Sequence, residues 1–158
     1  MSFDAFAQAF RDGDAATGNA VAARAVLSEV RYNHDSQFDS FVVEFADGSH
    51  LEMYAGGLHG NEPFNGAMFA LRGISDAIGD FMFRFSRAAG CVLLPAMEPP
   101  CVLLTDESQS QHLPSGMSDD FQVITISSGA ELLAALEGGY DSWRAYRDRI
   151  AGDPAGGT

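Results

Sequence analysis

One long amphipathic stretch, from Phe64 to Ala89, constrains the fold of this chain more than any other feature. Apolar side chains recur there at intervals of three and four residues for about six turns, which is the period of an α-helix. Gly90 then supplies a stop signal. The apolar stripe consists of Ala67, Met68, Leu71, Ile74, Ile78, Phe81, Met82 and Phe85. We therefore expect a long helix over 64–89 whose stripe must be buried against another layer.

Several segments around this predicted helix have the pattern of β-strands. Apolar and polar residues alternate over 26–32, 41–45 and 121–127, which is the period of a strand with one buried face. The short, continuously apolar runs 91–95 and 101–105 are typical of strands that are covered on both faces. We expect these strands and the long helix to share one core.

The turn between the strands that contain Val43 and Leu51 can be predicted in more detail. A two-residue turn would mix apolar and polar residues on each face of the hairpin. A three-residue loop over 46–48, with its glycine in the left-handed region, instead pairs Val43 with Leu51 and Phe41 with Met53. This register puts the apolar residues together, so we expect the three-residue form.

Shorter helices are expected towards both ends of the chain. Three phenylalanines within residues 3–10 would share one face of an N-terminal helix. The alanine-rich segment 20–25 fits either a helix or a strand. Ser128 followed by Glu131 is a capping-box signature for a short helix, and the glycine pair 138–139 is expected to separate it from a last helix.

Together these patterns predict an α+β fold. It has a mainly antiparallel sheet of about five to six strands, a long central helix packed across one face, and short terminal helices. The length of 158 residues favours one domain over residues 1–152, followed by a disordered tail over 153–158.

The charge of the chain restricts its partners. The formal net charge is −13, and the nine basic residues are all arginine. Binding to nucleic-acid phosphates needs clustered positive charge, and an acidic surface is repelled by anionic lipid. We therefore expect neither a nucleic acid nor a membrane as partner. A basic protein surface fits this charge, although many cytoplasmic proteins are acidic simply because charge keeps them soluble.

The two cysteines, Cys91 and Cys101, are predicted to be buried thiols. Each begins an apolar run, and an antiparallel hairpin would place Cys91 opposite Thr105 and not opposite Cys101, which disfavours a disulfide. There is no run of about 18 apolar residues, and the residues at the N-terminus lack the pattern of a secretory signal. These features predict a cytoplasmic protein.

One small cluster has the residue types of a metal site. His50, Glu52, His59 and Glu62 lie near one another in the sequence, and histidine and carboxylate bind zinc or iron. Their spacing matches no recognised ligand motif, and a solvated strand face with a Glu44–His50 pair is the competing interpretation. We predict no cofactor, and we keep a small metal-dependent hydrolase centred on these residues as an alternative.

Two regions are candidate contact sites for a protein partner. On the predicted long helix, two aromatic side chains lie within the acidic face and would form an apolar anchor with a charged rim, unless the C-terminal helices cover them. The acidic stretch 106–120 has no pattern, and loops this long are usually functional or disordered. A solvated connector is its competing interpretation. The candidate residues are Phe69, Asp76, Asp80, Phe83, Asp106, Glu107, His112, Asp119 and Asp120.

The leading hypothesis is a non-enzymatic, acidic binding protein: an inhibitor or immunity-type protein that neutralises a basic partner such as a toxin or effector. In size and charge the chain is similar to small acidic proteins that neutralise a cognate toxin, and this similarity is one of type, not of motif. A third hypothesis is an oligomeric structural or ligand-binding domain, with a homodimer as its simplest form.

Overall fold

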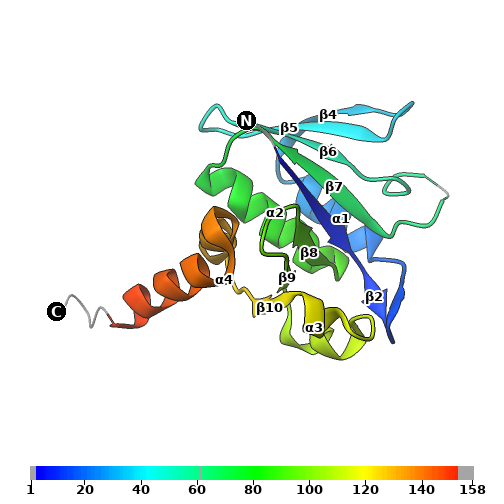
Figure 1. Cartoon of the computed structure of the whole chain (residues 1–158). Helices are drawn as coiled ribbons and strands as arrows, with labels where there is room; N and C mark the ends of the chain where they lie inside the picture. Colours follow the sequence, from blue (N-terminus) through cyan, green and yellow to red (C-terminus); the bar gives the residue numbers. More distant parts are fainter. Residues whose placement is uncertain (1–2, 61, 153–158) are drawn as a thin grey trace.

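The structure, a computed structural model, describes residues 3–60 and 62–152, and its main element is an eight-stranded sheet (Figure 1). The strand order is β10-β9-β8-β1-β7-β6-β5-β4. The pairs are antiparallel except for β9 and β10, which run parallel. The strands are β1 (Phe3–Gln8), β4 (Arg31–Asp35), β5 (Ser40–Glu44), β6 (His50–Tyr54), β7 (Gly66–Leu71), β8 (Val92–Pro95), β9 (Cys101–Leu104) and β10 (Gln122–Thr125).

Helices cover one face of this sheet. The long ones are α1 (Ala20–Leu27), α2 (Asp76–Ala89) and α4 (Gly129–Gly152). The remaining elements are a small hairpin of β2 (Phe10–Arg11) with β3 (Asp14–Ala15), the 3-10 helix η1 (Glu107–His112) and the short α3 (Met117–Asp120). The predicted α+β class with a mainly antiparallel sheet is therefore confirmed, but five to six strands is too few and a single long central helix is wrong.

The predicted helix over 64–89 is wrong in its first half. Residues 66–71 form β7, and α2 begins only at Asp76. Ser75 caps α2, because its hydroxyl accepts a hydrogen bond from the backbone N–H of Ile78 at 3.2 Å. The helix ends at Gly90, which has a left-handed φ of 77° and confirms the predicted stop signal.

The expected N-terminal helix is also wrong, because residues 3–8 form the strand β1. In β1, Ala5 and Ala7 face the core of the protein, and Phe6 faces the other side of the sheet.

The remaining helix predictions have mixed outcomes. The undecided segment 20–25 is helical. The predicted break at the glycine pair 138–139 is absent, since α4 continues through it. The tail over 153–158 lies outside the described residues.

The predicted hairpin between β5 and β6 is confirmed in register and turn. Val43 pairs with Leu51, Phe41 pairs with Met53, and Gly48 has a left-handed φ of 87°. The β8–β9 hairpin also follows the prediction. Leu93 lies opposite Leu103, which puts Cys91 opposite Thr105.

The main core lies between the sheet and its helices. Phe69 of β7 meets Phe85 of α2 edge to face, with ring centroids 6.1 Å apart. Helices α2 and α4 approach closely where both have glycine: a Cβ on Gly129 would lie 2.6 Å from the backbone nitrogen of Asp80. This close approach holds α4 against α2 on the helix-covered side of the sheet. In the part of the chain that the structure describes, no helix is long and apolar enough to cross a membrane.

Gly66, the first residue of β7, should be hard to replace. A Cβ there would lie 1.9 Å from the carbonyl oxygen of Ala7 on β1, so Gly66→Ala must push the two strands apart. We expect a loss of about 1–3 kcal/mol in the free energy of unfolding, measured by urea denaturation. Gly73→Ala is the matched control, because a Cβ at Gly73 meets no atom within 4 Å. Equal stability of the two variants would contradict this interpretation.

Candidate partner-binding face

The face of the sheet opposite the helices, here called the open face, presents an apolar row to solvent. The strand registers align Leu94, Phe6, Met68 and Tyr54 as neighbours across β8, β1, β7 and β6. Phe6 is 45% exposed and Tyr54 is 39% exposed. Val42 on β5 adds a further exposed apolar side chain. Aromatic and apolar side chains gathered on one exposed face are typical of a surface that binds another protein.

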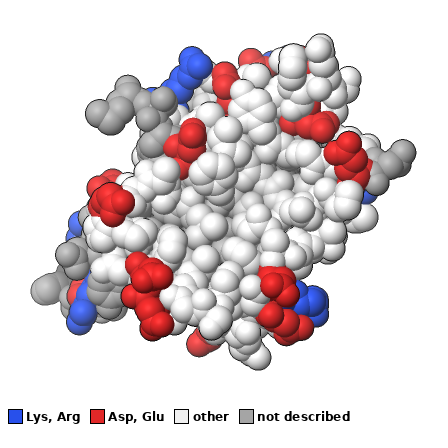
Figure 2. All heavy atoms as spheres, turned by 45° about the vertical axis from the view of Figure 1, so that its right-hand side comes forward, with Lys and Arg blue, Asp and Glu red and all other residues white. Residues whose placement is uncertain are grey.

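Acidic residues surround this row. Asp4 on β1 and Glu52 on β6 occupy the next row of the open face, on either side of Ala70. Figure 2 looks onto this side of the molecule and shows a broad uncharged area bordered by acidic side chains, with few arginines. Arg72 lies 3.7 Å from Glu52 and is itself largely exposed, so the pair is a weak surface ion pair.

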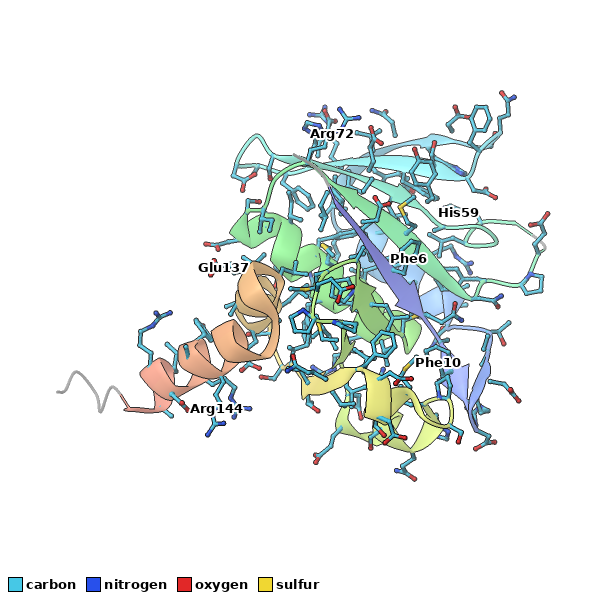
Figure 3. The ribbon with its side chains drawn as sticks, viewed as in Figure 1. Phe6, Phe10, His59, Arg72, Glu137 and Arg144 are labelled. Carbon is cyan, nitrogen blue, oxygen red and sulfur yellow. The ribbon has the colours of Figure 1, made fainter. Side chains whose placement is uncertain are left out.

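The acidic segment, defined as residues 106–121, folds against one end of the open face. Its residues Leu113, Met117 and Phe121 pack on a small apolar cluster formed by Val92, Val102 and Leu104 of β8 and β9. Leu94, the neighbour of Phe6, packs against the same cluster. The expectation of a patternless loop is therefore wrong: η1 and α3 form a wall beside the apolar row. Figure 3 shows Phe6 over the middle of the sheet and Phe10 nearer this segment.

Local hydrogen bonds hold the acidic segment in place. Asp106 caps η1 by accepting bonds from the backbone N–H and the hydroxyl of Ser108, and the hydroxyl bond lowers the pKa of Asp106 below its ordinary value. Gln109 accepts a bond from the backbone N–H of Thr105 at 2.8 Å. The imidazole Nδ1 of His112 accepts a bond from the backbone N–H of Asp12 at 3.2 Å. His112 therefore joins η1 to the β2–β3 hairpin, while its side chain stays half-buried.

The predicted aromatic anchor at Phe69 and Phe83 is wrong. Phe69 lies on β7 and is 0% exposed, and Phe83 lies on α2 and is 5% exposed, so neither reaches a partner. Asp76 and Asp80 are exposed, but they lie on α2, which packs on the other face of the sheet. The structure therefore separates these two acids from Glu107, Asp119 and Asp120, which are exposed on the acidic segment.

The four residues of the predicted metal cluster do not come together. His50 and Glu52 lie on the open-face side of β6, where Glu44 is confirmed as the neighbour of His50. His59 instead stands beside Phe41 on the helix side, with ring centroids 5.7 Å apart. Among the side chains that the structure describes, no group of three or more from histidine, cysteine, aspartate or glutamate could hold a metal ion.

His59 instead pairs with His34 at the helix side of β4, a neighbour that the predicted cluster did not include. The His34 ring stacks on Phe41 at 4.3 Å, and the His59 ring is 5.3 Å from His34. Partial burial lowers the pKa of His59, and the neighbouring His34 and Arg24 lower it further. Only Asp39 opposes these effects.

Sequence reasoning missed the open face because two of its members lie in segments interpreted as helix. Phe6 and Met68 become neighbours only when both segments are strands. The outward positions of the β5–β6 hairpin, which include Val42 and Tyr54, were the available signal. Comparison with protein-family models, curated proteins and solved structures gives no significant match. We therefore infer function from the geometry of this chain itself.

Both thiols should be inert in the folded protein. Burial raises the pKa of Cys91 to about 12 and that of Cys101 to about 11, and both side chains are fully buried. At pH 8 we expect almost no reaction with a thiol-specific chromogenic disulfide, because the thiolate is the reacting form. The same protein in guanidinium chloride should react at both cysteines. Rapid reaction of the native protein would contradict the burial of these two thiols.

His59 should titrate below the ordinary histidine value of 6.5. An NMR titration of its ring protons measures this pKa, and the unfolded protein supplies the reference. His34→Gln removes one positive neighbour and should raise the pKa of His59 part of the way back. Because the folded pKa is the lower one, protonation favours unfolding, so stability should fall as the pH drops through the unfolded value. A pKa above 6.5 would contradict this environment.

Proposed function

We propose that this chain is a non-enzymatic binding protein whose open face and acidic segment cover a basic surface of a partner protein. The observation that carries the proposal is the combination, on one side of the sheet, of an exposed apolar row with an acidic border. Phe6 and Tyr54 supply the apolar contact area, and the carboxylates supply long-range attraction for a basic protein. An inhibitor or immunity-type protein that masks a toxin or effector is the form of this function that we favour.

Charge argues against pairing of the open face with a second copy of the chain. Two copies would bring their acidic borders together, and each copy has a net charge of −13. Like charges facing each other across an interface cost association energy. A homodimer through this face would therefore be weaker than a complex with a basic protein, and light scattering at high concentration tests this.

The partner can be found by a pull-down with the tagged protein from the lysate of the cells that make it, at low and moderate salt. We expect one dominant basic protein that is released as the salt concentration rises, because screening weakens contacts between charged surfaces. An inhibitor should also abolish the activity of the purified partner. Absence of any enriched protein at low salt, or a partner that is acidic, would contradict the proposal.

Charge reversal on the acidic segment should slow association with that partner. In the variant Glu107→Lys/Asp119→Lys we expect the association rate constant at low salt to fall by about tenfold or more, since border charges act mainly on this rate. Stopped-flow or surface plasmon resonance measures it. The matched control is Glu137→Lys/Asp148→Lys on α4, which makes the same change in net charge on the helix side. An equal loss in both variants would mean that only net charge matters.

A further inference from the structure

A hollow of about 330 Å³ lies beside the apolar row, next to Phe6 and Tyr54. It lies where β7 begins, and Gly66 of β7 lines it together with Ala7 and Gln8 of the neighbouring β1. A Cβ on Gly66 would meet the carbonyl oxygen of Ala7, so the close pairing of β1 with β7 requires glycine at this part of the lining. Its lining includes Phe6, Gln8, Tyr54 and Glu62.

The chemistry of this lining fits a cation with an apolar stem. Phe6 and Tyr54 offer two exposed aromatic rings, which attract a cation electrostatically. Glu62 adds an exposed carboxylate, and among the described residues no arginine forms an ion pair with it. None of the residues that line the hollow is basic. Among the described residues, the charge of Glu62 is therefore not balanced by a basic side chain of the lining.

We propose that this hollow receives an arginine side chain of the basic partner. This inference rests on the proposed function and names the contact that would fix the partner's position on the open face. Arginine suits the hollow better than lysine does, because the planar guanidinium stacks on aromatic rings and binds a carboxylate with two parallel hydrogen bonds. Its methylene stem packs against Phe6 and Tyr54 while its head reaches Glu62.

The test uses three short peptides that differ in one side chain. Acetyl-Leu-Arg-Leu-amide is titrated into the ¹⁵N-labelled full chain at low salt, and the amide resonances of Gly66 and its neighbours are followed by NMR. The citrulline peptide has the same shape without the charge, and the lysine peptide has the charge without the planar fork. We expect saturable shifts around Gly66 with arginine, at least a threefold weaker affinity with lysine, and weaker binding still with citrulline.

The variant Glu62→Gln keeps the shape of the lining and removes its charge. We expect it to raise the Kd of the arginine peptide about fivefold or more, which corresponds to the loss of a charge-assisted contact. Glu137→Gln is the matched control, because Glu137 is an exposed glutamate on α4, away from Phe6 (Figure 3). It should leave the Kd within twofold. Neither substitution touches the core, so both variants should have the thermal stability of the parent chain.

Several outcomes would overturn the inference. Equal binding of the arginine and citrulline peptides would mean that shape, not charge, fills the hollow. At about 10 mM peptide, binding with a Kd in the millimolar range is visible by NMR. If the resonance of Gly66 does not shift at that concentration, the hollow does not bind arginine. A nona-arginine peptide separates this failure from failure of the proposed function. If it shifts resonances of the acidic segment while Gly66 stays unmoved, only the hollow is excluded. If it shifts none, both proposals fall.

Discussion

The pairing of β1 with both β7 and β8 is the interaction on which the rest of the structure depends. Without β1 the sheet would fall into two parts, the β4–β7 meander and the β8–β10 end. The strand fits this central place because its core-facing residues are small: Ala5 and Ala7 leave room for the helices on that side. Its outward residue Phe6 then lies at the centre of the open face, so one strand both closes the sheet and presents an exposed aromatic side chain.

Local periodicity explains how much of the fold the sequence could predict. The β5–β6 register was predictable because Phe41, Val43, Leu51 and Met53 can share a face in only one way. The stretch 64–89 was not, because a run of apolar residues satisfies both periods. In β7 the side chains alternate with Ala67, Phe69 and Leu71 inward, whereas the helical interpretation also used Met68. In β1 the inward residues are alanines, which give almost no hydrophobic contrast, so the spacing of the phenylalanines dominated.

The candidate site depends on which face of the sheet stays uncovered, and local patterns do not carry that information. The negative charge and the acidic segment were visible in the sequence, and the proposal of a basic partner began from them. The position of this segment against β8 and β9 depends on tertiary packing by Leu113, Met117 and Phe121. The burial of Phe69 and Phe83 also depends on tertiary packing. A helical wheel places both among acidic residues, which suggests exposure, but both are buried in the core. Which residues are buried depends on how sheet and helices pack together, and that packing joins segments that are distant in the sequence.

The central position of β1 links assembly of the fold to assembly of the open face. Strands β7 and β8, which flank it, come from segments much later in the chain, so β1 can dock only after long loops have closed. Until it docks, two strand edges inside the sheet stay unpaired, and such edges invite pairing with other chains. Phe6 is then not beside Met68, and the hollow at Gly66 has lost one wall. A partner that recognises this surface therefore recognises only the completed fold, and its binding stabilises the step that closes the sheet.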